Sequence, residues 1–283
     1  MKPIIHPFFD TATNTVTYLV ADPATRQAAI IDPVLDFDPK SGRLSTMQAD
    51  DVLAKARSEG LEIVWILETH AHADHLSAAD HLRHETGARI VIGEHIDAVQ
   101  KIFGALFEID APTRVFDRLV SEDDTLALGG LTISVLHTPG HTPACVTYLI
   151  GDAAFVGDTM FMPDYGTARA DFPGGDAGTL YRSIRKILAL PPETRIFVCH
   201  DYLPQGRIAH AWETNVALER AGNVHAHDGI SEAEFVAMRT ARDATLAAPT
   251  LILPSLQVNI LAGALPAPSP GGRIFLKLPV NAL

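Results

Sequence analysis

The sequence predicts an α/β protein in which two β-sheets lie between two layers of helices, a four-layer αββα sandwich. Short apolar runs bounded by Gly, Pro and Asp recur along most of the chain, and they fall into two groups. Segments with helical spacing accompany each group. Hydrophobic residues make up 47% of the 283 residues, which supplies enough apolar surface for a large core. Sheets covered by helices bury such runs on both faces.

The first group alternates strands with helices. Each expected strand is a short apolar run, and each expected helix has apolar residues at helical spacing before a glycine, namely Gly60, Gly87 or Gly104. The turn residues 22–25 (Asp-Pro-Ala-Thr) join the first two strands into a hairpin. The strands are expected at residues 14–20, 28–31, 62–68 and 89–92, and the helices at 47–59, 76–86 and about 95–103.

The second group consists mainly of strands that follow one another closely, as in a largely antiparallel sheet. A helix over 179–188 and an apolar run over 195–199 complete it. The chain is therefore expected to form a single domain over 1–283, with a core at about 1–203 and a C-terminal extension at about 204–283, in which residues 266–272 form a turn-rich linker. The strands are expected at 115–120, 125–128, 131–136, 145–150 and 153–157.

A dense cluster of ligand-type side chains follows the apolar run 63–67. It consists of His70, His72, Asp74 and His75. Imidazoles and a carboxylate packed this closely repel and desolvate one another unless a cation holds them. The cluster therefore predicts half of a metal site.

Three further ligand-type residues end apolar runs elsewhere in the chain. His141 follows the run 131–136, Asp158 follows 153–156, and His200 follows 195–199. Sites at the carboxyl edges of sheets produce this pattern, because several strands then deliver side chains to one place. These residues are expected to complete the metal site.

In order and spacing, the seven residues resemble the ligand set of the metallo-β-lactamase superfamily, whose fold is the αββα sandwich. Blocks at 141–148, 157–158, 169–172, 179–184 and 200–202 are also similar to the persulfide dioxygenases of the ethylmalonic-encephalopathy protein type, which share this ligand pattern with glyoxalase II. Pro249, the pair 258–259 and Gly263 resemble the closing segment of those dioxygenases.

This resemblance implies one Fe²⁺ per chain, held by His70, His141 and Asp158, with His72, Asp74, His75 and His200 persisting without a second metal. A triad of two histidines and one carboxylate leaves positions open for O₂ and a substrate thiolate. The implied reaction oxidises glutathione persulfide, or a related persulfide, with O₂ to sulfite. The resemblance also places Arg169 and Tyr202 near the iron, where they help to arrange the pocket around the catalytic Asp158. Asp201, directly after His200, is interpreted as a residue that orients the ligands.

The alternative uses every ligand and two Zn²⁺ per chain. His70, His72 and His141 would then form one site, Asp74, His75 and His200 the other, and Asp158 would bridge them. Two cations would activate a hydroxide for attack on a thioester or lactone carbonyl, as in a glyoxalase II-like hydrolase.

Two segments depart from the dioxygenase pattern. Residues 162–176 form a longer loop, with Ala170 where the pattern has threonine, and 95–120 is also longer. Both are expected to remodel the mouth of the pocket, which leaves the identity of the persulfide substrate open.

The composition limits which classes of partner the protein is expected to bind. The net charge of −12 provides no basic surface for nucleic acid, and no apolar run is long enough to predict a membrane span. The N-terminus has neither a secretory nor a transit-peptide pattern, and Cys145 and Cys199 do not suggest a disulfide framework. We expect a cytoplasmic enzyme whose partners are O₂ and a small glutathione-linked thiol or persulfide. The resemblance to the dioxygenases also implies that the protein forms a homodimer.

The remaining histidines and several aspartates have simpler interpretations. His81 and His84 are expected on a solvated helix face, and His137 at a turn. The other residues are expected on the surface or in loops and turns: His6, His95, His210, His225, His227, Asp32, Asp152, Asp164, Asp171 and Asp176.

Overall fold

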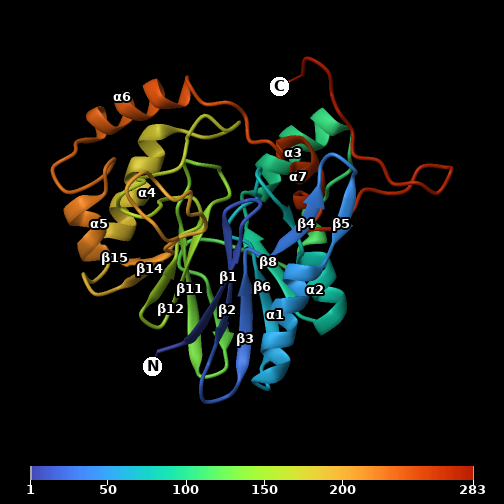
Figure 1. The fold of residues 1–283 in the computed structure, drawn as a ribbon, viewed down its shortest axis with the longest axis horizontal. Coiled ribbons are helices and arrows are strands. Elements are labelled where there is room, and N and C mark those ends of the chain that lie inside the picture. Colours follow the sequence, from blue (N-terminus) through green and yellow to red (C-terminus); the bar gives the residue numbers. More distant parts are fainter. Residues whose placement is uncertain (1, 283) are drawn as a thin grey trace.

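Two six-stranded sheets form the centre of the molecule, and Figure 1 shows helices α1 to α3 beyond one of them and α4 to α6 beyond the other. The computed structural model describes residues 2–282. The αββα prediction is confirmed. The helices are α1 (Met47–Ser58), α2 (Ala79–Thr86), α3 (Ile96–Phe107), η1 (Thr113–Val115), α4 (Ala177–Leu188), α5 (Val216–Gly222), α6 (Glu232–Asp243) and α7 (Ile252–Asn259).

The first sheet is mixed, in the order β1-β2-β3-β6-β8-β9. Its first three strands are antiparallel, and β3, β6, β8 and β9 are parallel. Every residue of β2 is buried, which explains its continuous apolar sequence. The strands are β1 (Ile4–Asp10), β2 (Thr15–Ala21), β3 (Gln27–Ile31), β6 (Glu62–Leu67), β8 (Arg89–Gly93) and β9 (Arg118–Val120).

The second sheet runs β10-β11-β12-β13-β14-β15 and is antiparallel except for the parallel pair β13 and β14. A small third sheet, β5-β4-β7, lies beside the first. The second-sheet strands are β10 (Thr125–Leu128), β11 (Leu131–His137), β12 (Val146–Ile150), β13 (Ala153–Phe155), β14 (Arg195–Phe197) and β15 (Glu213–Asn215); the third sheet comprises β4 (Val34–Asp38), β5 (Arg43–Ser45) and β7 (Leu76–Ser77).

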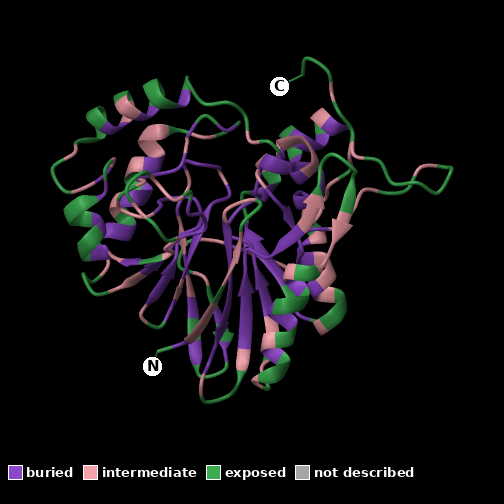
Figure 2. Ribbon diagram, viewed as in Figure 1, coloured by how far each residue is buried: buried purple, intermediate pink, exposed green. Residues whose placement is uncertain are grey.

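The core occupies the three interfaces between these layers, and the buried residues follow the strands in Figure 2. Tyr18, Phe155 and Phe197 pack edge-on or stacked between the two sheets. Phe103 and Phe107 of α3 belong to the cluster outside the first sheet, and Leu180 and Ile184 of α4 to the cluster outside the second. Each pair of neighbouring layers is therefore held together by its own apolar interface.

Several sequence expectations differ from the structure. Gly104 lies inside α3 and does not end it, because the helix continues far enough to bury Phe107. An interior glycine costs about 1 kcal/mol, whereas burying a phenylalanine side chain contributes about 2–3 kcal/mol. Residues 118–120 pair with β8 in the first sheet and not with the second sheet. The segment 76–86 is not helical throughout, because Leu76 and Ser77 form β7 and α2 begins only at Ala79. The expected end of this helix before Gly87 is confirmed, and Gly87 is left-handed.

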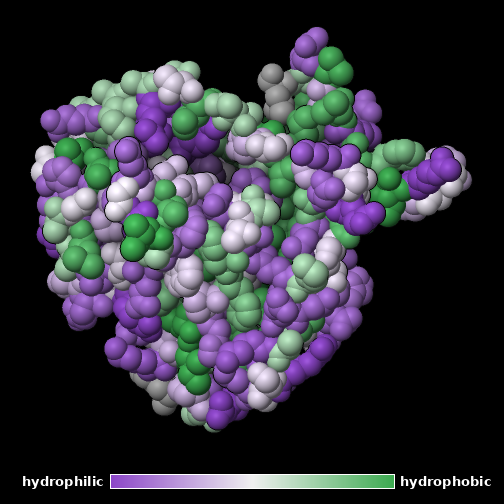
Figure 3. All heavy atoms as spheres, in the orientation of Figure 1, coloured by the Kyte–Doolittle hydropathy of each residue, from purple (hydrophilic) through white to green (hydrophobic). Residues whose placement is uncertain are grey.

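The C-terminal extension contains α5, α6 and α7 and then continues without helix or strand to residue 282. Helix α7 packs with α3 and β7 beside the first sheet. The segment after it stands out from the body of the molecule in Figures 1 and 3, and it exposes Ile274, Phe275, Leu278 and Val280. Among the helices in residues 2–282, none combines the length and the hydropathy needed to cross a membrane.

Candidate metal centre

The structure brings all seven candidate ligands to one end of the two large sheets. The loop between β6 and β7 carries four of them, and the others follow β11, β13 and β14. Each of these strands ends in the same region, which is where a sandwich of this kind delivers side chains from separate parts of the chain. The seven residues are His70, His72, Asp74, His75, His141, Asp158 and His200.

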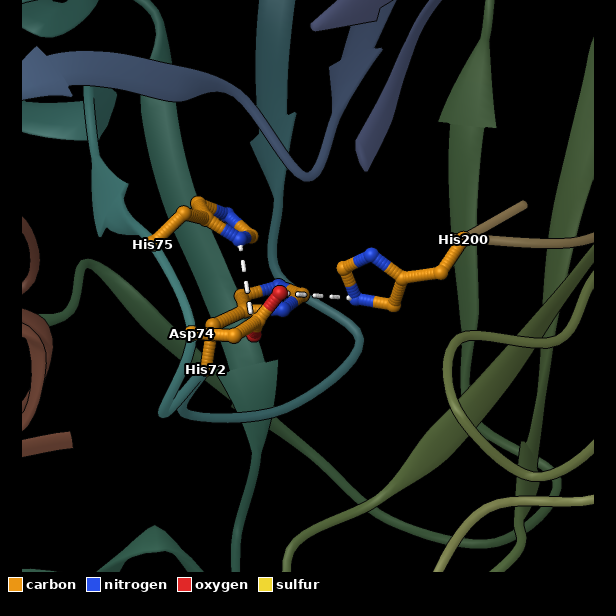
Figure 4. A group of neighbouring side chains, drawn as sticks. All are labelled: His72, Asp74, His75 and His200. Atoms are coloured by element: carbon orange, nitrogen blue, oxygen red, sulfur yellow. Dashed lines mark ion pairs between the residues drawn. The ribbon is translucent and has the colours of Figure 1, made fainter. Parts of the chain in front are cut away.

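The ligand atoms form two groups. In one, His70, His141 and Asp158 have their ligand atoms within 4.8 Å of one another, and in the other the same holds for His72, Asp74, His75 and His200. Figure 4 shows the second group, in which Asp74 lies between the His75 and His200 rings, with Oδ1 3.7 Å from His75 Nδ1 and Oδ2 3.3 Å from His200 Nε2.

Asp158 lies between the two groups. Its Oδ2 is 3.8 Å from His70 Nε2 and 3.7 Å from His141 Nε2, and its Oδ1 is 3.2 Å from His200 Nε2. A single carboxylate therefore faces ligand atoms from both sides of the site.

The chemistry of these donors fits a bound cation. Buried nitrogen and oxygen atoms of six of the residues have no hydrogen-bond partner among the described residues, and each such atom costs about 1–3 kcal/mol when nothing satisfies it. Unpaired buried atoms on several neighbouring ligand-type residues are expected where a metal ion supplies the missing interactions. The atoms are His70 Nε2, His72 Nδ1, Asp74 Oδ2, His75 Nε2, Asp158 Oδ1 and His200 Nε2.

Hydrogen bonds behind the rings fix which nitrogen faces the site. Thr69 Oγ1 donates to Asp32, so it accepts from His70 Nδ1 at 3.0 Å and leaves His70 Nε2 without a proton. His141 Nδ1 donates to the carbonyl of Arg169 at 2.8 Å, which leaves Nε2 free in the same way. Burial lowers the pKa of His70 well below its ordinary value. The neutral ring is the form that binds metals.

Asp32 is a buried residue behind the site, and its assignment to a simple turn is wrong. Its carboxylate accepts from the Thr69 backbone N–H at 2.7 Å and from His72 Nε2 at 3.1 Å. Burial lowers the pKa of His72, but the nearby Asp32 and Glu68 carboxylates raise it by more. The pKa of His72 is therefore well above its ordinary value. The contact with Asp32 keeps a proton on His72 Nε2 and turns Nδ1 toward the other candidate ligands.

Glu68 is a second buried carboxyl that the sequence reasoning missed. Its Oε1 accepts from Ser77 Oγ, and its Oε2 lies 3.5 Å from His72 Nε2. Burial raises the pKa of Glu68. Its place in the sequence could have indicated this role, because it is an acidic residue directly after a buried strand and two positions before the first histidine of the cluster.

A cavity of about 140 Å³ opens onto Asp74, His141 and Asp158. Aromatic residues form part of its wall, with Tyr202 5.0 Å from the Tyr165 ring and stacked on His200 at 5.6 Å. Partial burial and the Asp74 and Asp158 carboxylates raise the pKa of Tyr202 well above its ordinary value, so its hydroxyl stays protonated at neutral pH.

Arginines form another part of the wall. Arg169, Arg239 and Arg242 line the cavity. The Arg169 guanidinium pairs with Asp171 and donates to the Ala247 carbonyl at 2.7 Å, while its own carbonyl accepts from His141. This residue therefore contributes both to the cavity wall and to the orientation of a candidate ligand.

Helix α6 holds the long loop 162–176 against the cavity. Arg239 donates to the Thr167 carbonyl at 3.1 Å and pairs with Asp243, which in turn accepts from the Ala170 N–H at 2.9 Å. The loop thus supplies residues 165 and 167–169 to the cavity wall. The other long segment, 95–120, forms α3, η1 and β9 and contributes none of the described lining residues, so its expected place at the mouth is wrong.

Asp201 makes different contacts from those expected of an orienting residue. Its buried carboxylate pairs with Arg207 and with His210, and it accepts from the Ala211 N–H at 3.0 Å. No hydrogen bond joins it to a candidate ligand in the described part of the chain. It fixes the turn after His200 instead.

Both cysteines are buried free thiols. Burial raises the pKa of Cys145 to about 12 and that of Cys199 well above its ordinary value. Cys199 Sγ lies within 4.8 Å of ligand atoms of Asp158 and His200. Because a buried protonated thiol is a weak ligand, the structure is consistent with a structural role for both.

Residues 10–200 match the Metallo-beta-lactamase superfamily. The chain belongs to this superfamily, as the ligand pattern and the αββα fold predicted. Among solved structures, ETHE1 from Myxococcus xanthus has a TM-score of 0.75 and 32% identity, covering 92% of this chain and 100% of that one.

Curated relatives carry two kinds of name. A probable metallo-hydrolase of Burkholderia pseudomallei is 53% identical and covers 99% of both chains. A β-lactamase hydrolase-like protein of Xylella fastidiosa is 50% identical, and this chain spans 65% of its length. The persulfide dioxygenase ETHE1 of Homo sapiens is 31% identical over 70% of this chain and 68% of its own. The names of these relatives thus include both a hydrolase and a dioxygenase, the two kinds of reaction that the sequence analysis considered.

Proposed function

We propose that this chain is a mononuclear Fe²⁺ persulfide dioxygenase that oxidises glutathione persulfide, or a related persulfide, to sulfite. The observation that carries the proposal is that the ligand atoms of His70, His141 and Asp158 all lie within 4.8 Å of one another, in a group that does not include His72. Two imidazoles and a carboxylate in one group are the ligand set of a facial triad.

Bound in this triad, Fe²⁺ would supply open coordination positions for O₂ and for the substrate thiolate. The overall reaction consumes one persulfide, one O₂ and one water, and yields one sulfite, one thiol and two protons. Asp158 and His141 border the cavity, so a substrate in the cavity would lie against two of the three triad residues. The protonated Tyr202 hydroxyl is a hydrogen-bond donor at the same wall.

The cavity suits an anionic substrate. Arg169 and Arg239 are each paired with an aspartate, whereas Arg242 is exposed and has no ion pair among the described residues. An unpaired guanidinium at the rim of a cavity binds carboxylates by charge-assisted, bidentate hydrogen bonds. Glutathione persulfide carries two carboxylates, which this residue can recognise. The likeness to ETHE1 proteins in sequence and structure supports the same substrate class.

Oxygen consumption tests the proposal. Protein purified anaerobically and loaded with Fe²⁺ is expected to consume O₂ when glutathione persulfide is added, and to form sulfite in equal amount. Iron-loaded protein that takes up no O₂ with this substrate would refute the dioxygenase assignment.

A second candidate, a dinuclear zinc hydrolase of thioesters or lactones, is favoured by a different observation. Unpaired buried atoms of Asp74, His75 and His200 gather on the other side of Asp158, where they could hold a second cation. The hydrolase names of two relatives agree with it. Two Zn²⁺ per chain, together with turnover of a lactoylglutathione-like thioester, would establish this alternative.

A further inference from the structure

Asn259 in the C-terminal extension contacts the loop that carries four of the candidate ligands. Its side-chain amide donates to the carbonyl of His72 and to the carbonyl of His75, both at 2.8 Å, and its oxygen accepts from the Ser77 N–H at 2.8 Å. Both donor positions and one acceptor position of a single amide are thus used on the short segment 72–77, which comprises the end of the loop and β7. We propose that Asn259 is a positioning residue of the metal site.

No helix or sheet ladder holds the backbone of the loop at these points. The loop leaves β6 after Leu67 and reaches β7 at Leu76, and residues 70–75 belong to no helix or strand. A backbone carbonyl on a ligand residue moves with that residue's Cα, so holding the carbonyls of His72 and His75 limits how far their rings can turn. Precise ligand geometry requires such support, because a site displaced by about 1 Å binds its metal poorly.

The amide itself is held rigidly. Asn259 is 4% exposed at the end of α7, and Gln100 of α3 donates to the next carbonyl, that of Ile260, at 2.9 Å. Gly263 then turns the chain at φ +84°, against the loop end and the start of α2. A Cβ there would lie 2.9 Å from both Ser77 O and Asp80 N. The extension can approach the loop this closely only because no side chain intervenes.

Apolar packing fixes the helix on the same surface. Leu256, Val258 and Ile260 are fully buried in the cluster outside the first sheet, which also contains Leu76 and Ala79. The burial of these three apolar side chains stabilises the position of α7, and so of the Asn259 amide, against the polar ligand loop. The C-terminal extension is therefore part of the metal site's support.

Gln257 provides a matched control. It is a buried amide on the same helix, with hydrogen bonds at 2.7–2.9 Å, but its partners are the Leu253 carbonyl and the backbone of Lys277 in the projecting C-terminal segment. Gln257→Ala removes a buried amide of similar size and similar bonding from α7 without touching the ligand loop.

Co²⁺ binding to the full-length protein tests the proposal, followed by visible absorption and by competition with a chelator. Asn259→Ala is expected to weaken Co²⁺ binding at least tenfold and to change the absorption bands, because outer partners of metal ligands contribute about 10–100-fold in affinity. Gln257→Ala is expected to stay within twofold of wild type. Asn259→Asp keeps an acceptor for the Ser77 N–H, but it replaces the two donors with a carboxylate that is repelled by the carbonyls of His72 and His75. This variant is therefore expected to resemble Asn259→Ala.

Wild-type affinity and spectrum in both Asn259 variants would overturn the proposal, as would an equal loss in Gln257→Ala. Hydrogen exchange of the unmodified protein decides the question if the variants do not fold. By linkage, adding metal is expected to protect residues 70–77 and 252–260 together, but not 264–282. Protection confined to the loop would contradict the proposal.

The proposal rests on the metal site proposed above but not on iron or on O₂ chemistry. If the protein binds Co²⁺ in an Asn259-dependent manner but the iron-loaded protein consumes no O₂, the dioxygenase proposal is refuted and the role of Asn259 is still supported.

Discussion

The buried carboxyl of Glu219 makes the stability of the fold depend on pH. Glu219 lies on α5 and is 0% exposed; one oxygen accepts from Asn223 Nδ2 at 2.7 Å, and the other has no partner among the described residues. Burial raises its pKa from 4.5 to about 8. The folded protein therefore keeps this proton at neutral pH, whereas the unfolded chain releases it.

The sign and size of the effect follow from this difference. Below pH 4.5 the group is protonated in both states and costs nothing. Between pH 4.5 and about 8, unfolding releases a proton, so the free energy of unfolding falls by about 1.4 kcal/mol for each pH unit. Above about pH 8 the group is ionised in both states and the loss levels off. The whole window is worth on the order of 5 kcal/mol, and the part up to pH 7 about 3 kcal/mol.

Glu219→Gln removes the titration and leaves an acceptor for Asn223. Its buried amide nitrogen adds a cost of about 1–3 kcal/mol that does not change with pH. Urea unfolding at several pH values between 5 and 8 is expected to show the variant gaining on wild type as the pH rises. Val216→Ala, a buried apolar change on the same helix, is expected to lower the free energy of unfolding by a constant amount. A difference between Glu219→Gln and wild type that stays constant with pH would refute the reasoning.

Three further predictions concern the site. His75→Ala and His200→Ala are expected to retain most dioxygenase activity but would abolish a two-metal hydrolase, whereas Asp158→Ala is expected to destroy either; equal loss of iron from all three variants would contradict a mononuclear site. Arg242→Ala is expected to raise KM for glutathione persulfide about tenfold with little change in kcat, because a charged hydrogen bond contributes about 1.5–3 kcal/mol; an equal rise for an uncharged persulfide would exclude carboxylate recognition. Asp32→Asn is expected to lower metal affinity about 10–100-fold in chelator competition, and unchanged affinity would remove its orienting role.

The sequence was most informative where strands end in ligand-type residues. His141, Asp158 and His200 could be predicted to meet the histidine cluster, because each follows an apolar run and strand ends of one sandwich share an edge. The layers were predictable for a similar reason, since helix and strand periodicities alternate along the chain.

Long-range contacts could not be predicted in the same way. Asp32 follows a strand and precedes a proline, a context typical of turns, and only the fold places it against His72, forty residues away. Asn259 meets the ligand loop across more than 180 residues. Residues 118–120 pair with β8 at the edge of the first sheet. A short apolar run predicts a strand but does not show which of the two sheets that strand joins.

Anaerobic titration of the metal-free protein with Fe²⁺, with O₂ uptake on glutathione persulfide measured at each step, tests the central proposal most directly. The mononuclear triad of His70, His141 and Asp158 predicts that activity rises with iron and reaches its maximum at one Fe²⁺ per chain. Activity that requires two metal ions per chain, or no O₂ uptake at any iron content, would contradict it.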